Sequence, residues 1–381
     1  MGLVQTTPRA RSAPFTLVGW GGGAAPLCRI TSRIHRRAIR VWLYAIAALL
    51  VLMVMVGGTT RLTDSGLSIV EWHPVTGIVP PLSESAWAAE FTKYKTSPEY
   101  ELVNKGMSLG EFKRIYWWEW VHRLLGRLIG AAFLIPLVFF QLRGWIEPGI
   151  KWRLWFIFGL GALQGAIGWW MVASGLVGRV DVAQERLAVH LLMACLILTA
   201  VIWTARLLTP AAANGATRVT PRRLAVSAIA ILVLLLGQIA LGGLVAGLKA
   251  GLIYNTWPLI DGAFIPPREH LFLLAPAWLN LLDNHLAVQF THRMVAYVLV
   301  AVGALHAADC SWHRVCRRSA VALALFLLLQ AMLGIATLLL QVPILLALAH
   351  QAVAIAALIA ATLHAANLRV QPESSFQHAA R

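Results

Sequence analysis

The chain has 381 residues, of which 59% are hydrophobic and only 13% are charged. Soluble domains are about 45–50% apolar and about 25% charged, so this composition excludes a soluble enzyme. The formal net charge of +16 would indicate nucleic-acid binding only if the basic residues formed one solvated face. They are instead spread over the segments between apolar stretches, and we therefore expect no nucleic-acid partner.

Eight stretches are long and apolar enough to cross a bilayer, for which an α-helix needs about 17–25 residues. They cover residues 39–58, 115–140, 154–176, 187–205, 224–247, 286–308, 319–341 and 345–366. The sequence therefore predicts an all-α integral membrane protein with eight transmembrane helices, in contact with lipid. A basic N-terminal tail (1–38) and a short C-terminal tail (369–381) flank them.

The basic residues between these stretches predict how the chain is oriented, because cytoplasmic loops carry an excess of Lys and Arg. With a cytoplasmic N-terminus, that side carries 19 basic and three acidic residues, against ten basic and twelve acidic on the other. We therefore expect both termini in the cytoplasm and the protein in a bacterial inner membrane. The tail has many Arg and no acidic residues, as in an organelle transit peptide, so the mitochondrial inner membrane is the alternative.

The two halves of the chain share a pattern of polar and small residues. The matching positions are Gly57–Gly58 with Gly242–Gly243, Trp72 with Trp257, His122–Arg123 with His292–Arg293, Gln164 with Gln330, Gly168 with Gly334, and His190 with His350. Such self-similarity indicates a duplication. It predicts two tandem pseudo-symmetric four-helix bundles, residues 39–208 and 209–368, of which the first carries a long external loop at 61–113.

Four histidines lie at corresponding places of the repeat, a turn or two inside the external end of their helices: His122, His190, His292 and His350. Imidazole pairs across a helical bundle suit a six-coordinate heme iron, so these four are the predicted metal ligands. A single intramembrane His is often only a polar packing residue, but four at one depth favour a functional site. Zinc is the weaker metal alternative, since no Cys or carboxylate completes a tetrahedral set in both halves.

One position near these histidines differs between the halves. Glu119 precedes His122 by three residues and shares its helix face, whereas the matching residue is Gln289. An intramembrane carboxylate is costly unless it is paired or used, so Glu119 is either a structural partner of a nearby Arg or a catalytic group. The asymmetry favours a reacting first half and a second half that only holds a redox cofactor.

An arginine follows a predicted ligand in each half. Arg123 and Arg293 lie near the external surface, where they are predicted to bind anionic heme propionates. The alternative for each arginine is a structural role, in which its guanidinium extends to the membrane–water interface and stays hydrated.

The motifs GGTTRLTDSGLSIVEWHPVTG (57–77), EFKRIYWWEWVHRLLGRLIG (111–130), LQGAIGWWMVASGL (163–176) and FTHR (290–293) resemble those of the heme A synthase family, in its alphaproteobacterial and mitochondrial branch. The resemblance covers residues 39–368. It implies an eight-helix oxidoreductase that oxidises one porphyrin methyl group of heme O to a formyl group, giving heme A for cytochrome oxidase. Glu119 would be the catalytic carboxylate, and His122 and His190 would face the heme O substrate.

The same resemblance implies a resident heme b whose iron is ligated by His292 and His350. It also implies heme O synthase (protoheme farnesyltransferase) and cytochrome oxidase assembly factors as partners, with a homo-oligomer left open. A non-catalytic di-heme b electron-transfer cytochrome is the alternative function. The difference between Glu119 and Gln289 favours the enzyme.

Overall fold

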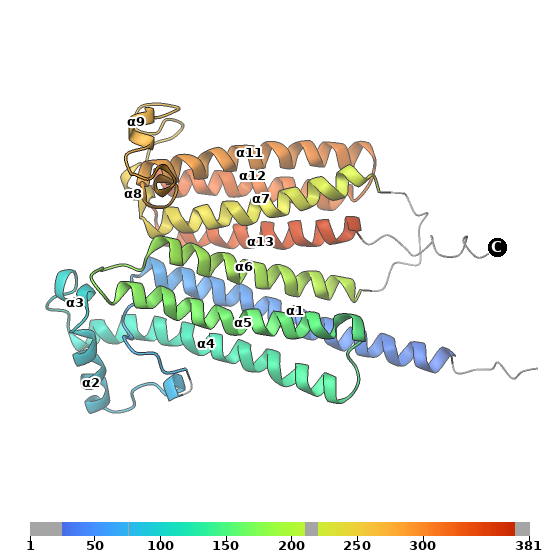
Figure 1. Cartoon of the computed structure of the whole chain (residues 1–381), viewed down its shortest axis with the longest axis horizontal. Helices are drawn as coiled ribbons and strands as arrows, with labels where there is room; N and C mark the ends of the chain where they lie inside the picture. The colour runs from blue at the N-terminus through green and yellow to red at the C-terminus, as the bar shows by residue number, and fades with distance from the viewer. Residues whose placement is uncertain (1–24, 75, 210–219, 370–381) are drawn as a thin grey trace, which may run out of the picture.

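The structure is a computed structural model that describes residues 25–74, 76–209 and 220–369. Within this part of the chain, eight helices are long and apolar enough to cross a membrane, and Figure 1 shows them running alongside one another. They are α1 (Ala25–Leu62), α4 (Leu109–Leu142), α5 (Pro148–Gly175), α6 (Gln184–Leu207), α7 (Arg222–Gly247), α11 (His285–Trp312), α12 (Arg317–Leu339) and α13 (Ile344–Arg369). The prediction of an all-α protein with eight such helices is confirmed.

The helix boundaries differ most from the prediction at α1, which begins at Ala25, inside the segment predicted as a tail. An apolar run marks where a helix enters lipid, and the helix itself can continue into water. Smaller differences have local causes. Thus α12 ends at Leu339, because Gln341 and Val342 adopt positive φ values of 60° and 58° that cannot continue a helix. Residues 1–24 and 370–381 of the predicted tails lie outside the described residues.

Two long loops cover one end of the helices, opposite the end where α1 begins and α13 ends (Figure 1). The first loop contains α2 (Glu84–Tyr94) and α3 (Pro98–Leu102), and the second contains α8 (Ala250–Ile253), α9 (Arg268–Leu271) and α10 (Asn280–Asp283). We call this end the loop end. Local signals start the helices that emerge from it: Ser108 and Glu111 form a capping box at α4, and Asn284 caps α11.

The long helices pack in two groups of four. Helix α1 contacts α4 and α6, and α5 contacts α4 and α6, so these four close a ring that we call the first unit. Helices α7, α11, α12 and α13 close a second ring in the same way, the second unit. Helices α6 and α1 of the first unit lie against α7 and α13 of the second.

Small residues let the two units approach closely. A Cβ atom added at Gly247 of α7 would lie 2.8 Å from Cα of Gln184 on α6, which shows that only a glycine fits there. Near the same end, Arg61 donates to the carbonyl of Ala246 at 3.2 Å and pairs with Asp181 at 3.3 Å. Backbone packing and a charged cluster therefore hold the units together at the loop end.

The first loop has an apolar core of its own. Trp87, Phe91 and Tyr94 of α2 pack on Phe112 and Tyr116 of α4. Below them lies the carboxyl group of Glu99, 4% exposed, which accepts a hydrogen bond from the Tyr94 hydroxyl at 3.1 Å. Burial, together with repulsion from other carboxylates, raises the pKa of Glu99 from 4.5 to about 7.

This raised pKa predicts a pH-dependent loop. A carboxyl group whose pKa is higher in the folded state stabilises that state fully below its unfolded pKa of 4.5, and the contribution is lost as the pH rises through about 7. We expect hydrogen-exchange protection of residues 84–102 to fall roughly tenfold or more between pH 5 and pH 8. In the variant Glu99→Gln this dependence should vanish; an unchanged dependence there would assign it to another group.

Candidate functional site

The four predicted histidine ligands lie on four different helices, two in each unit. His122 is on α4 and His190 on α6, whereas His292 is on α11 and His350 on α13. Each imidazole is only partly accessible. Helices α4 and α6 lie on opposite sides of the first ring, each packed against α1 and α5, and α11 and α13 lie on opposite sides of the second, each packed against α7 and α12. The two predicted ligands of each unit therefore stand on helices that face each other across a ring.

Each of these rings lies against a glycine of a neighbouring helix. A Cβ atom added at Gly57 would lie 3.3 Å from Cε1 of His122, and one added at Gly242 would lie 3.4 Å from Cε1 of His292. The corresponding distance is 2.9 Å both from Gly168 to His190 and from Gly334 to His350. These glycines are the ones that match between the halves of the sequence, which gives that match a physical reason: a larger residue would displace the imidazole.

Three of the four histidines also contact a glutamine side chain. The Nε2 atom of Gln238 donates to the carbonyl of His292, and that of Gln164 donates to the carbonyl of His190, each at 3.0 Å. The Nε2 atom of Gln330 lies 3.2 Å from Nε2 of His350. The Oε1 atoms of all three glutamines are buried without a hydrogen-bond partner among the described residues. A buried acceptor without a hydrogen bond costs free energy, so these three oxygens indicate that an additional polar group binds in this region.

The pairs fit a heme in each unit. Neutral imidazoles are the expected ligands of heme iron. The ring of each histidine lies against a glycine of a neighbouring helix in its bundle, where the backbone leaves room for the imidazole. When bound, the iron would supply redox chemistry that no side chain of these units offers.

The carboxyl group of Glu119 is buried, with 3% exposure, and each of its oxygens has partners. Oε2 accepts from the Ser68 hydroxyl at 2.7 Å and from the Ile69 amide at 2.9 Å. Oε1 accepts from Nη2 of Arg123 at 2.6 Å and from its Nε at 3.0 Å. The sequence predicted a nearby Arg partner as one option, but not the contribution of Ser68 and Ile69, which come from the loop.

The second unit repeats this network with an amide in place of the carboxylate. Gln289 is 2% exposed; its Oε1 accepts from Nη2 of Arg293 at 3.3 Å, and its Nε2 donates to the carbonyl of Tyr254 at 2.9 Å. Arg293 also donates to the carbonyls of Tyr254 and Leu259. In both units, then, the residue three positions before the histidine and the Arg after the histidine hold the loop against its helix, with a carboxylate that only accepts in the first unit and an amide that also donates in the second.

These bonds bear on the arginines predicted to bind propionates. Arg123 donates to the carbonyls of Ile69 and Glu71 as well as to Glu119. Arg293 keeps one buried donor, its Nε, without a partner among the described residues, and Nη1 of Arg127 is in the same position. These bonds use four of the five N–H groups of Arg123, which leaves one hydrogen of Nη1 for a propionate, and Arg293 and Arg127 each have a donor to spare as well.

A methyl group at the glycine beside His350 is expected to weaken heme binding. In Gly334→Ala the new Cβ would lie 2.9 Å from the imidazole, and overpacking of this kind costs about 1–3 kcal/mol. We expect roughly tenfold weaker retention of a b-type heme, measured by heme titration of the purified variant. Gly237→Ala in α7 meets no atom within 4 Å and should bind heme as the unmodified protein does; equal loss in both variants would contradict the role of the glycine.

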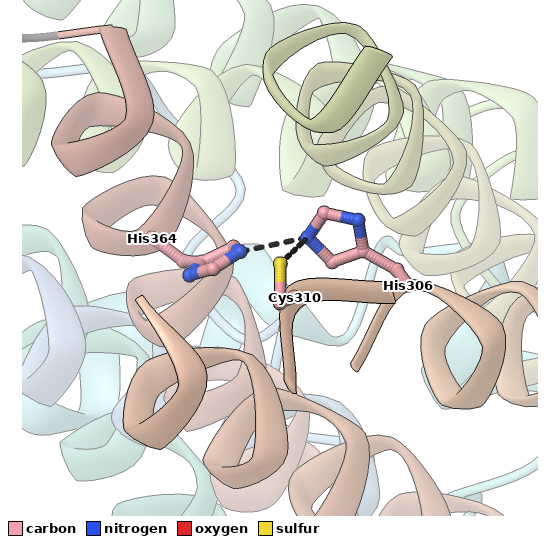
Figure 2. Close-up of side chains that lie close together, drawn as sticks. All are labelled: His306, Cys310 and His364. Atoms are coloured by element: carbon pink, nitrogen blue, oxygen red, sulfur yellow. Dashed lines mark hydrogen bonds between the residues drawn. The ribbon is translucent and has the colours of Figure 1, made fainter. Parts of the chain in front are cut away.

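Sequence reasoning missed a second buried cluster. His306 and Cys310 of α11 and His364 of α13 meet at the end of the second unit opposite the loops (Figure 2). A signal for half of the cluster was present, because His306 and Cys310 are four residues apart on one helix face; nothing in the sequence indicated that His364 would join them.

Comparisons with known proteins agree on one group. A family model described as "cytochrome oxidase assembly protein" matches residues 40–362. The chain is 57% identical over 329 residues to the heme A synthase of one strain of Rhodopseudomonas palustris, covering 86% of this chain and 90% of that one. It is 54% identical over 334 residues to the heme A synthase of a Bradyrhizobium species (87% and 91% covered) and 54% identical over 333 residues to that of Azorhizobium caulinodans (87% and 94% covered).

Proposed function

The chain belongs to the cytochrome oxidase assembly protein family that includes the heme A synthases, and from this premise we propose how its two units divide the work. Its activity is the conversion of heme O to heme A, an oxidoreductase reaction in a multi-pass membrane protein. The substrate is therefore heme O. The division of labour between the units is the proposal that follows.

We assign the substrate to the first unit and a resident heme b to the second. The observation that carries this assignment is the single change of charge in an otherwise repeated network, Glu119 in the first unit and Gln289 in the second. A unit that only passes electrons needs no ionisable group beside its iron ligands. A unit that removes hydrogen from a substrate carbon needs a proton acceptor.

In the second unit His292 and His350 would hold the heme b iron, with Arg293 near the propionates. The b-type heme would supply a one-electron carrier. The residues of the unit position it: Gly242 and Gly334 leave room for the imidazoles, Gln238 donates to the His292 carbonyl, and Gln330 lies against the His350 ring. Nε of Arg293 has no partner in the part of the chain that the structure describes, so a carboxylate can use it.

In the first unit His122 and His190 would face heme O, and Glu119 would act on the methyl group that becomes the formyl group. Oxidation of that carbon releases protons together with electrons, and a carboxylate held out of water is a suitable proton acceptor. Arg123, Ser68 and the Ile69 amide fix the position of the carboxylate. The Trp72 ring, stacked on Trp169 at 5.7 Å, provides apolar cover from the loop.

We further propose a bacterial inner membrane as the location, with both termini in the cytoplasm and the loop end outside. The charge distribution between the helices supports this orientation, and the first loop and the second loop then cover the outer surface. The expected protein partners are heme O synthase, which makes the substrate, and cytochrome oxidase assembly factors, which receive the product.

The division of labour is tested by extracting hemes from the purified protein after co-expression with a source of heme O. Chromatography with mass detection should return heme B together with heme O, a hydroxylated heme or heme A. In Gly168→Ala, heme O and its products should fall while heme B remains, because only the first unit is disturbed. Loss of heme B in that variant would contradict the assignment of substrate and cofactor to the two units.

A further inference from the structure

The cluster of His306, Cys310 and His364 is the most unusual buried polar group outside the heme-binding pairs. The three side chains are 4%, 0% and 0% exposed. Nε2 of His306 lies 2.7 Å from Nε2 of His364 and 3.5 Å from Sγ of Cys310, as the dashed lines in Figure 2 show. Three atoms that commonly bind metal ions thus converge on one point.

Two serines orient both imidazoles. The hydroxyl of Ser227 on α7 lies 2.8 Å from Nδ1 of His306, and the hydroxyl of Ser319 on α12 lies 2.8 Å from Nδ1 of His364. Each hydroxyl has one hydrogen and also lies within hydrogen-bond distance of a backbone carbonyl, that of Leu224 or of Cys316. When the hydroxyls donate to these carbonyls, the serine oxygens accept from Nδ1–H of both rings, and each Nε2 is then free to bind a metal ion.

The 2.7 Å between the two Nε2 atoms is a hydrogen-bond distance, so without a metal ion one ring donates its Nε2–H to the other; a bound cation takes the place of this hydrogen, and the two nitrogens move apart to become its ligands. From this arrangement we propose that the cluster binds a monovalent copper ion, with Nε2 of both histidines and Sγ of Cys310 as ligands. Each helix of the second unit contributes: α11 and α13 the ligands, α7 and α12 the orienting serines.

Charge favours Cu⁺ over Zn²⁺ at this place. One thiolate and two neutral imidazoles neutralise Cu⁺ completely, but would leave a net positive charge around Zn²⁺ in a buried site. The nearest acidic residue on α11, Asp309, points its carboxylate to Arg223 at 2.9 Å. Zinc also takes four ligands as a rule, whereas the described residues offer three, and soft thiolates select Cu⁺. Binding replaces the Cys310 thiol proton, which is released to solvent.

A heme is not a suitable occupant. Its iron would have to lie between the two imidazoles with the porphyrin separating them, and nitrogens already at 2.7 Å leave no gap for the macrocycle. The site is thus separate from the pairs assigned to heme, and the proposal does not depend on that assignment.

The experiment is an anaerobic titration of the detergent-solubilised full-length protein with Cu⁺ buffered by a competing chelator. Copper and iron are counted separately by elemental mass spectrometry, and X-ray absorption identifies the ligands. We expect about one tightly held copper per chain with nitrogen and sulfur neighbours. Cys310→Ala should weaken binding by at least about a hundredfold, and Ser319→Ala by about 10–100-fold through lost orientation of His364.

Cys195→Ala is the matched control, because this thiol of α6 is equally buried but belongs to no such cluster of the described residues. It should bind copper as the unmodified protein does. Heme b content in every variant shows whether the second unit is folded. No retained copper in the unmodified protein, equal copper in Cys310→Ala, or stoichiometric Zn²⁺ that Cu⁺ does not displace would each overturn the proposal.

Discussion

Replacing Glu119 by Gln is expected to lower heme A formation by about 10²–10⁴-fold, the usual contribution of a positioned acid or base, with heme b still bound. The reason is loss of the proton acceptor beside the substrate methyl group. The measurement is heme A produced per protein after co-expression with a heme O source, together with the heme b content of the same preparation.

The second unit makes this variant unusually informative. There, Gln289 keeps the arginine and the loop in place without a charge, through bonds of 3.3 Å to Arg293 and 2.9 Å to Tyr254. Glu119→Gln keeps the size of the side chain but places an NH2 group against the donors that bind Glu119, so the heme b content of the same preparation must show that the protein still folds. Gln289→Glu is the matched control, which should leave both activity and heme b content near normal. Normal turnover in Glu119→Gln would make Glu119 a purely structural partner of Arg123.

Loss of either histidine of the second unit should empty it of heme b. Removal of one of two axial ligands is expected to weaken heme b binding at least about a hundredfold, since even outer-shell partners of a metal are worth about 10–100-fold. The variants are His292→Ala and His350→Ala, and the readout is the reduced heme spectrum of the purified protein with extracted heme B as the quantity.

The first unit supplies the control for this experiment. His122→Ala and His190→Ala should retain heme b while losing bound heme O and its oxidised products. Heme b retained in full by both His292→Ala and His350→Ala would contradict the assignment of the second unit. A similar loss of heme b from all four variants would instead indicate that the units do not fold independently.

The linear sequence was sufficient for the eight helices, and it also predicted the histidine pairs. Apolar runs of sufficient length identify a transmembrane helix locally, because lipid forces the backbone to satisfy its own hydrogen bonds. The duplication then placed His122 and His292 at one depth, and His190 and His350 at the same depth. Helix ends were less well predicted, as at α1, since hydrophobicity reports the lipid boundary and not the last hydrogen-bonded turn.

The partners of each side chain depended on which helix faces meet. The sequence did not indicate that Ser68 and the Ile69 amide would bind Glu119 from a loop fifty residues away, because such contacts follow from how the loop folds back on α4. The glycines beside the imidazoles were visible as repeated letters, but their purpose was not, since a close approach exists only between packed helices.

The contrast is greatest at the two kinds of histidine site. The sequence predicted four histidines as metal ligands, because the duplication places a histidine at matching positions of both halves: His122, His190, His292 and His350. His306 and His364 have no counterpart in the first half, and they come together only because α11 and α13 close the same ring. Periodicity along one helix therefore determined what each helix presents, and the packing of helices decided which of those groups meet.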